Sequence, residues 1–379
     1  MKMKSVYCYM LAGLMLSASS CSSWLSEDDA PVMSYDYYET EAGVNAAITA
    51  AYGFLRWGVG GERFDVLTEL GTDLFTEGED GSNRESYNKY ATQLNPDDGI
   101  LYEMWENHYK GISDANIAMQ KIRDSQDLLE SVKIQSYAEM QFIRAYLYFD
   151  LVQQFGRIPL VTEGSFEIRT DFKRAPIADV YNVIISDLRN AAENLPEKAS
   201  VLGRATRYSA AHLLAKVYLT RGSAVKDARG QKATDMDSTL YYAEQVINSG
   251  AYALQENFSS LWDIKNQGNS EAVFAVQFTT EPMFNGDGNK QHLYWLSWYE
   301  DQPGMLRDIE NGRPYRRHVA TKKTMDDLFD RLHDSRFYKS FKWVYYANNV
   351  STLPVWESLS YDGNVYFTPD TSKAVSYTH

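Results

Sequence analysis

The stretch AEMQFIRAYLYFDLVQQFGRIPL, residues 138–160, decides the fold. Its pattern predicts a helix from Gln135 to Phe155 with apolar side chains on nearly every side. A helix of that kind is buried within a larger helical assembly. Gly156 favours the end of this helix, and Pro159 prevents it from resuming. The chain is therefore expected to build its core from packed helices.

One charged residue, Arg144, lies in the most apolar part of this helix. A buried guanidinium is costly unless it is paired and hydrogen-bonded. Glu139 and Asp150 are at the wrong offsets for ideal pairing within the same helix. We therefore expect Arg144 to play a structural role and to find its partner on another helix.

Further helices are predicted on both sides of this one, from small and apolar residues at helical spacing and from Pro and Gly at the ends. They span Ala42–Leu55, Leu101–Ile122, Pro176–Leu195, Thr206–Arg221 and Asp237–Ser249. The four helices between Gln135 and Ser249 form two antiparallel pairs. They resemble tetratricopeptide architecture, in which helix pairs stack because no pair buries its apolar face alone. We expect a mainly α fold of tetratricopeptide-like helix pairs with long loops.

The character of the chain changes after Gly250. Residues 271–278 (EAVFAVQF) read as a buried strand or an extended segment, residues 279–317 are loop-rich and aromatic, and Thr324–Leu332 predicts a short helix. The C-terminal part is thus expected to be loop-rich, with little strand. The chain divides into a signal peptide at residues 1–20, a tether at 21–40, a helical-repeat region at 41–270 and a loop-rich, incomplete ligand-binding region at 271–379.

The N-terminus has the layout of an export signal. Lys2 and Lys4 precede an apolar stretch, roughly Val6 to Leu16, which is too short to span a bilayer. Small residues then run up to Cys21, and this ending resembles a bacterial lipobox. The resemblance implies cleavage before Cys21 and attachment of lipid (palmitate among the acyl chains) to that residue. The alternative is an ordinary secretory signal with an incidental cysteine.

Composition excludes several classes of function. The net charge of −14 argues against nucleic-acid binding, which needs clustered Lys and Arg. The sequence lacks a zinc-binding His-Glu-x-x-His motif, a phosphate-binding loop and a nucleophile elbow. The six histidines are scattered, so we expect no local metal site, no cofactor and no catalysis. His212, among Leu and Ala, reads as a packed core residue.

Two groups of residues with side-chain oxygens could indicate a catalytic or a calcium site, but a simpler structural interpretation exists for each. Glu69, Asp73 and Glu77 recur every four residues, as paired carboxylates of a glycosidase could, but Gly71 and Gly78 favour a solvated loop. The stretch from Asn285 to Asn289 has oxygen ligands suited to calcium, but it lacks the distal Glu of a calcium loop. We read it as a turn.

The aromatic run Tyr294-Trp295-Leu296-Ser297-Trp298-Tyr299 is the best candidate for ligand contact. Sugars present apolar C–H faces and a rim of hydroxyls, so a sugar site needs flat rings beside polar side chains. Polar residues flank this run, including Asp287, Asn289, Gln291, Glu300 and Asp301. Tyr294, Trp295 and Trp298 are therefore candidate ligand-binding residues. Structural packing of each ring remains the alternative.

Motifs spread in order over residues 40–341 are similar to those of one family. They are WENHYKGISDAN (105–116), AEMQFIRA (138–145) with FGRIPL (155–160), Arg174 with Val180-Tyr181, GRAT (203–206) leading into AAHLLAKVYL (210–219), and DRLHDSRF (330–337). This set resembles the SusD/RagB family of outer-membrane lipoproteins from Bacteroidetes. Members of that family continue much further, so the resemblance predicts that this chain is C-terminally truncated.

The resemblance implies a function. Family members are lipid-anchored at the cell surface, where they capture glycans, and in some cases peptides, for a TonB-dependent SusC-like barrel transporter in the outer membrane. They bind nutrients without known catalysis. Their glycan-binding aromatic residues commonly lie on loops in the region of Tyr294 and near Trp57, which adds Trp57 to the candidates. The alternatives are a lipid-anchored hydrolase and a helical-repeat scaffold for protein assembly.

Overall fold

A computed structural model describes residues 40–78, 80, 84–90, 94–165, 169–225, 229–281, 286, 288–342, 344–349, 360, 361, 364, 365 and 375–377. The predicted signal peptide, Cys21 and the tether as far as residue 39 lie outside the described residues, as do Asn285 and Asp287. Within the described part of the chain, none of the helices combines the length and the hydropathy needed to span a bilayer.

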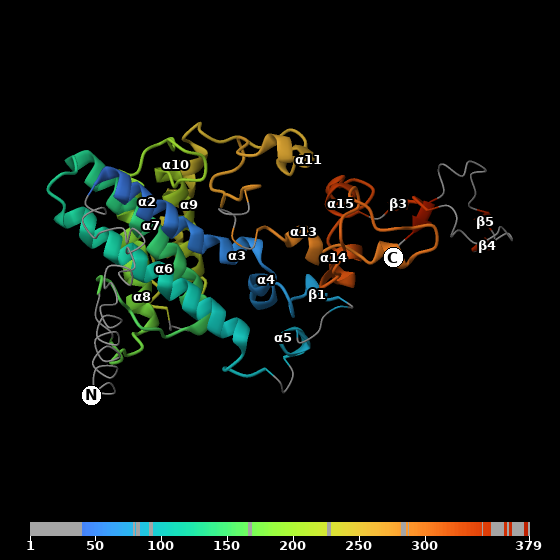
Figure 1. The fold of residues 1–379 in the computed structure, drawn as a ribbon, viewed down its shortest axis with the longest axis horizontal. Coiled ribbons are helices and arrows are strands. Elements are labelled where there is room, and N and C mark those ends of the chain that lie inside the picture. Colours follow the sequence, from blue (N-terminus) through green and yellow to red (C-terminus); the bar gives the residue numbers. More distant parts are fainter. Residues whose placement is uncertain are drawn as a thin grey trace, which may run out of the picture.

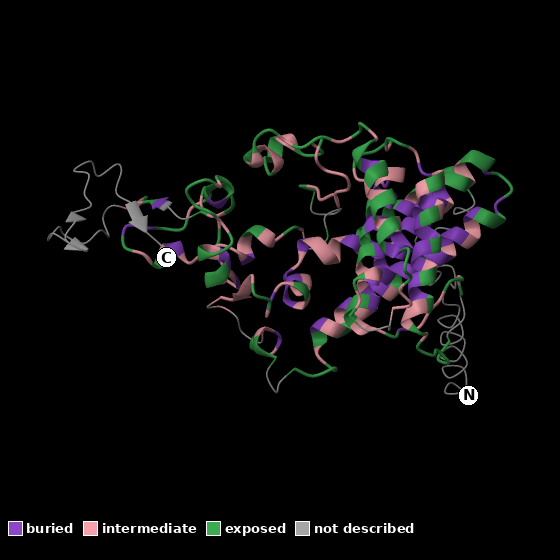
Figure 2. Ribbon diagram, turned by 180° about the vertical axis from the view of Figure 1, so that it is seen from behind, coloured by how far each residue is buried: buried purple, intermediate pink, exposed green. Residues whose placement is uncertain are grey.

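The longer helices are grouped at one end of the molecule (Figure 1). They are α2 (Glu41–Gly53), α6 (Gly99–Asp124), α7 (Glu130–Phe155), α8 (Ile177–Asn194), α9 (Arg207–Gly222) and α10 (Asp235–Ile247). From α6 to α10 each helix packs against the next, and α2 lies against α6 and α7. The buried residues concentrate in this group (Figure 2), and they form the main hydrophobic core. The predicted helices are confirmed, with ends shifted by a few residues.

Helix ends follow the local chemistry. Gly156 ends α7 with a φ of 67°, a left-handed value that glycine tolerates best. Thr206 caps α9, because its side chain accepts from the Ser209 N–H while the Ser209 side chain accepts in return. At its other end α7 begins at Glu130, five residues earlier than predicted. Its first two turns are largely polar and exposed, so no apolar period marks them in the sequence.

Arg144 connects three helices at the centre of this group. Its guanidinium donates to both carboxylate oxygens of Asp187 on α8, at 2.8 and 2.7 Å, and to the side-chain oxygen of Asn116 on α6, at 2.7 Å. A further bond of 2.9 Å reaches the carbonyl of Thr162, in the segment after α7. Arg144, Asp187 and Asn116 are all buried. The structure thus confirms the expectation that the partner of Arg144 comes from another helix.

The remaining elements are short. The helices are η3 (Phe54–Arg56), α3 (Trp57–Gly60), α4 (Glu62–Thr68), α5 (Glu85–Lys89), α11 (Phe258–Leu261), η4 (Ile264–Asn266), α13 (Gln291–Tyr294), η5 (Tyr299–Asp301), α14 (Lys322–Asp326) and α15 (Arg336–Ser340). The strands pair antiparallel: β1 (Phe75–Glu77) with β2 (His318–Ala320), β3 (Val344–Tyr346) with β6 (Val375–Tyr377), and β4 (Ser360–Tyr361) with β5 (Asn364–Val365). Phe75 faces Ala320 in the first pair.

Three sequence expectations need correction. Residues 271–278, expected to be a buried strand or an extended segment, form no strand, and they are half-buried rather than buried. They lie against helices, where Phe274 packs on Tyr52 and Phe142. The helix expected at Thr324–Leu332 covers only Lys322–Asp326. His212 is exposed, because the buried face of α9 passes through its neighbours Ala211 and Leu213 and on to Leu214.

A buried acid and a buried histidine meet between α4 and β2. The Nε2 atom of His318 lies 3.7 Å from Oδ2 of Asp65, too far for a hydrogen bond. Among the described residues, neither ring nitrogen of His318 has a hydrogen-bond partner. Burial raises the pKa of Asp65 to about 6 and lowers the pKa of His318 to about 4. Near pH 5, the folded protein therefore holds the proton on Asp65, with both groups neutral.

Removing one side of the buried ion pair should destabilise the fold strongly. In Arg144→Met, Asp187 stays buried without its main partner, and we expect the free energy of unfolding to fall by about 3–5 kcal/mol. Arg123→Met is the control, because Arg123 contacts Asp124 at an exposed site, and it should change stability by less than about 0.5 kcal/mol. Chemical denaturation measures both. Equal effects of the two substitutions would contradict a structural role for Arg144.

Single substitutions should reveal two opposite pH effects in the Asp65–His318 pair. Unfolding lets His318 take up a proton, so Asp65→Asn should lose stability when the pH falls from 7 to 5. His318→Gln keeps only Asp65, which is protonated more readily in the folded state, so this variant should gain stability over the same range. Each change is on the order of 1–3 kcal/mol. In the unsubstituted chain the two largely cancel. Thermal melts at both pH values measure this, and slopes of the same sign would refute it.

Candidate ligand-binding cleft

A cleft of about 710 Å³ lies beside the helical group. One wall comes from η3, α3, the start of α4 and the side of α6 that bears Glu103 and Asn107. The other wall comes from residues between Phe278 and Arg317. In Figure 1, α3 and α4 lie between the helical group and the C-terminal segments, which places the cleft where these parts meet.

Two of the ring residues predicted from sequence line this cleft together. Trp57 on α3 is half-buried, with its ring edge-on to Phe64 and to His108, at centroid distances of 6.2 and 5.6 Å. Tyr294 on α13 is buried and stacks on Tyr315 at 5.9 Å. Burial, with the nearby carboxylate of Glu62, raises the pKa of Tyr294, so its hydroxyl stays protonated at neutral pH.

The other two predicted rings lie outside the lining. Trp295 packs edge-on to Phe75 of β1 at 4.9 Å, close to His318, and its indole N–H donates to Oε1 of Gln291 at 2.9 Å. Trp298 is half-buried beside the start of η5. Adjacent residues of a helix point about 100° apart, which is why Tyr294 and Trp295 face different neighbours.

Phe278 is a lining ring that the sequence argument missed. A side chain at Gly60 would place its Cβ 2.5 Å from the Phe278 ring, so the ring can approach only because residue 60 is a glycine. The guanidinium of Arg56 lies over the same ring, 5.6 Å from its centroid. The glycines that follow the first predicted helix were the only sequence signal for a close approach at residue 60. That Phe278 is the ring that approaches there follows from the tertiary fold alone.

Charged side chains fill much of the remaining lining. The carboxylate of Glu62 is shared by two arginines. The Nη2 atom of Arg84 donates to Oε2 at 2.8 Å and its Nε atom lies 2.7 Å from Oε1, while Arg317 forms an ion pair with the same carboxylate from the opposite wall. Arg63 pairs with Glu103 at 2.9 Å. Among the described lining residues, the carboxylates of Glu62 and Glu103 are thus both held in ion pairs. The arrangement is suited to holding a polar ligand.

The acidic residues singled out in the sequence do not form a site. Glu69 caps the end of α4, Asp73 pairs with Lys323, and Glu77 lies in β1. Across the described residues, no group of three His, Cys, Asp or Glu side chains could hold a metal ion. These carboxylates therefore lie on a loop and a strand, as the glycines between them indicated.

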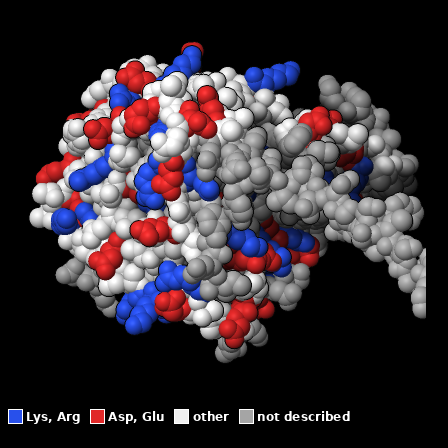
Figure 3. Space-filling model, turned by 60° about the vertical axis from the view of Figure 1, so that its left-hand side comes forward, with Lys and Arg blue, Asp and Glu red and all other residues white. Residues whose placement is uncertain are grey.

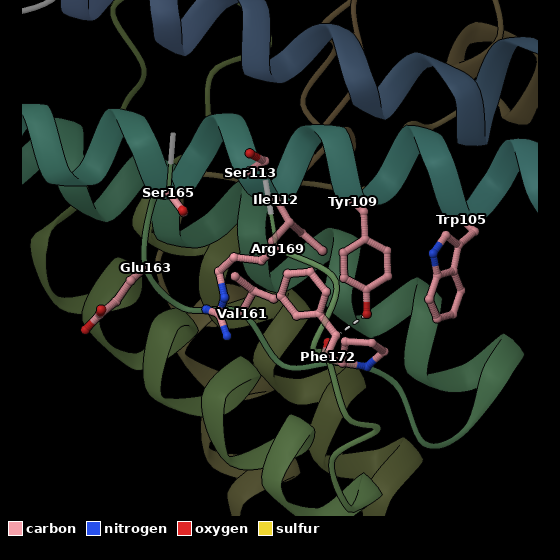
Figure 4. A pocket seen from close by; sticks show the side chains of 10 residues that line it. Trp105, Tyr109, Ile112, Ser113, Val161, Glu163, Ser165, Arg169 and Phe172 are labelled. Carbon is pink, nitrogen blue, oxygen red and sulfur yellow. Dashed lines mark hydrogen bonds between the residues drawn. The ribbon is translucent and has the colours of Figure 1, made fainter. Parts of the chain in front are cut away.

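A second cavity, of about 520 Å³, opens on α6 (Figure 4). The rings of Trp105 and Tyr109 point from α6 into it, and Phe172 approaches from the segment after α7. The hydroxyl of Tyr109 donates to the Pro159 carbonyl at 2.7 Å, and Trp105 packs edge-on to Phe155. These rings hold the segment after α7 against the helix. The lining is mostly apolar, so it suits a hydroxyl-rich ligand less well than the first cleft does.

Comparisons with known proteins agree on one family. Residues 32–219 match the sequence profile described as "Starch-binding associating with outer membrane". SusD-like protein P2 of Formosa agariphila is 27% identical over 341 residues, which are 82% of this chain and 63% of that protein. The starch-binding protein SusD of Bacteroides thetaiotaomicron is 27% identical over 176 residues, 46% of this chain and 29% of that protein. The chain thus spans less than two thirds of the length of these relatives.

Solved structures show the same fold. A laminarin-binding SusD-like protein superimposes with a TM-score of 0.66 at 24% identity, over 81% of this chain and 66% of its own. A structure determined with xylogluco-oligosaccharide gives a TM-score of 0.58 at 22% identity, over 74% and 54%. The mainly helical fold class is confirmed. By its sequence and by its fold, this chain belongs to the SusD/RagB family of SusD-like proteins.

Proposed function

We propose that this protein binds a glycan in the cleft between Trp57 and Tyr294 and does not cleave it. The main support for this proposal is that two aromatic residues far apart in the sequence line one cleft, together with charged and polar side chains. Aromatic rings cover the apolar faces of sugars, and the polar groups pair with hydroxyls. The starch-binding description of the family and the glycan named for two solved relatives support this choice of ligand.

The strength of binding follows from the number of rings. Covering ~100 Å² of apolar surface contributes about 2.5 kcal/mol before the costs of association. Trp57, Phe278 and part of Tyr294 therefore supply enough contact for useful retention only when they act together. Trp295 and Trp298, the other rings predicted from sequence, would reach a ligand only if it extended beyond the lining.

We further propose that the protein works at the surface of the outer membrane, held there by lipid on Cys21, and passes its glycan to a SusC-like TonB-dependent transporter. The lipobox-like sequence supports the anchor. The description of the family supports a location at the outer membrane. Two or more acyl chains make attachment stable, whereas a single chain gives marginal binding. Among the described residues of the cleft, no feature favours the hydrolase alternative.

Trp57→Ala should weaken glycan binding at least about tenfold, because it removes one ring of the platform. The matched control is Trp262→Ala, since Trp262 is 71% exposed and lies outside the cleft. Affinity electrophoresis of the full chain against a panel of polysaccharides measures retention. Unchanged retention in Trp57→Ala would remove this residue from the site.

Gly60→Ala tests the same cleft without removing a ring. The new methyl group would meet Phe278 and displace it into the cleft, so affinity should fall several-fold while the melting temperature changes little. Gly53→Ala is the control, because a Cβ at residue 53 meets no atom within 4 Å. If both variants bound as well as the original chain, the Gly60–Phe278 contact would not shape the site.

Cys21→Ala should release the protein from membranes and abolish glycan import, while the affinity of the purified protein for its glycan stays the same. Membrane fractionation, uptake by growing cells and titration measure the three properties. Uptake that survived this substitution would show that tethering is dispensable.

A further inference from the structure

Trp57, the ring on the helical wall of the proposed site, packs against a buried histidine. Its ring lies edge-on to the imidazole of His108, with the centroids 5.6 Å apart and the planes at 84°. Phe64 of α4 also meets it edge-on, at 6.2 Å. Trp57 is half-buried, whereas His108 is only 1% exposed. The orientation of a ring that lines the cleft therefore depends on a core residue that is closed to solvent.

Both ring nitrogens of His108 face atoms that can only accept a hydrogen bond. Nδ1 lies 2.8 Å from the carbonyl oxygen of Met104, one turn earlier on α6. Nε2 lies 3.4 Å from Oδ2 of Asp150 on α7. A neutral imidazole carries one N–H, so it can donate to only one of these acceptors. The shorter contact assigns that proton to Nδ1, which leaves Nε2 without a proton opposite a carboxylate.

A second proton on the imidazole completes this arrangement. The imidazolium donates from both nitrogens, and a charged N–H donates to a carboxylate at about 2.7–2.9 Å. The present 3.4 Å between Nε2 and Oδ2 leaves room for that shortening. The two side chains are only 2% and 14% exposed. By contrast, the charges of both signs that are interspersed over the face in Figure 3 lie at the surface, where salt screens them.

The surroundings assign a proton gained here to this pair. Within the described part of the chain, Asp150 is the one charged group that pairs with His108. Tyr146 lies one turn before Asp150; burial, and to a lesser extent the Asp150 charge, raises its pKa, so its hydroxyl stays neutral. Trp57 and the Met104 carbonyl do not titrate. Histidine is the side chain that ordinarily gains or loses a proton between about pH 5 and 8.

We propose that His108 and Asp150 are positioning residues for Trp57, and that protonation of His108 tightens glycan binding by fixing the Trp57 ring. This inference rests on the proposed glycan-binding function and adds its regulation by pH. When Nε2 carries a proton, it donates to Asp150 and locks the imidazole between α6 and α7. The indole packed on it is then held in one orientation, and a ring that is pre-organised lowers the cost of binding. When Nε2 is bare, it repels the carboxylate, and both rings are held less firmly.

The test measures how the affinity of the full chain for neutral polysaccharides depends on pH. The panel includes starch, laminarin and xyloglucan, which carry no titrating group, so a pH effect arises from the protein. We expect the polysaccharide that is retained to bind more tightly at about pH 5.5 than at about pH 8. The expected difference is about threefold to tenfold, which corresponds to roughly one hydrogen bond. Equilibrium titration at both pH values measures it.

Substitutions locate the effect. Asp150→Asn supplies an amide that can donate to the bare Nε2, so affinity should be kept at both pH values and the difference between them should vanish. In His108→Gln the difference should also vanish, with weaker binding at both pH values. The control is Asp65→Asn, which removes a buried acid with a pKa of about 6 that lies outside the cleft lining; the pH difference should persist. Thermal melts at both pH values establish that each variant is folded.

The outcomes separate this inference from the proposed function. If a polysaccharide binds in a Trp57-dependent manner but equally well at both pH values, the role of the His108 proton is wrong and the binding function stands. If the pH difference persists in His108→Gln or in Asp150→Asn, it arises from another group, and the inference is again wrong. If no polysaccharide of the panel is retained at either pH, the glycan-binding function fails, and this inference fails with it.

Discussion

The buried pairing of Arg144 with Asp187 is the constraint on which the helical group depends. A guanidinium in the most apolar helix is tolerated only where a carboxylate, an amide oxygen and a carbonyl oxygen all reach it. These partners come from α6, α8 and the segment after α7, so the network fixes how three helices and their connection pack. The same device recurs between α9 and α10, where buried Arg221 donates to Asp235.

The position of the cleft follows from this packing. Phe274 inserts against Tyr52 of α2 and Phe142 of α7, and Arg56 holds the carbonyl of Gln277 three residues later. These contacts fix the segment 271–278 on the helices, so that the ring of Phe278 lies against Gly60. One wall of the cleft is thus an extension of the helical core, and a single extended segment connects it to the other.

The helices were predictable because apolar periodicity is a local property, and so was the need of Arg144 for a partner. The identity of that partner was not, since Asp187 is 43 residues away and its helix reads as an ordinary amphipathic one. Likewise, the aromatic run indicated ligand contact, but not which rings share a cleft. Phe278 and Arg56 carry no individual signal in the sequence, because their proximity arises only from the tertiary fold. The sequence left open whether residues 271–278 form a strand or an unpaired extended segment, because apolar character alone does not supply a pairing partner.

Hydrogen bonds from side chain to backbone join distant parts of the chain across the cleft. Gln291 donates from α13 to the carbonyl of Gly61, across 230 residues of sequence. Closing so long a loop costs conformational entropy, and a few hydrogen bonds between small elements repay little of it. A molecule that touches both walls would therefore act as a removable clasp, and its binding free energy would add to the stability of the C-terminal segments first. Occupancy of the cleft would then be reported by protection of residues 286–317 from proteases and from amide hydrogen exchange.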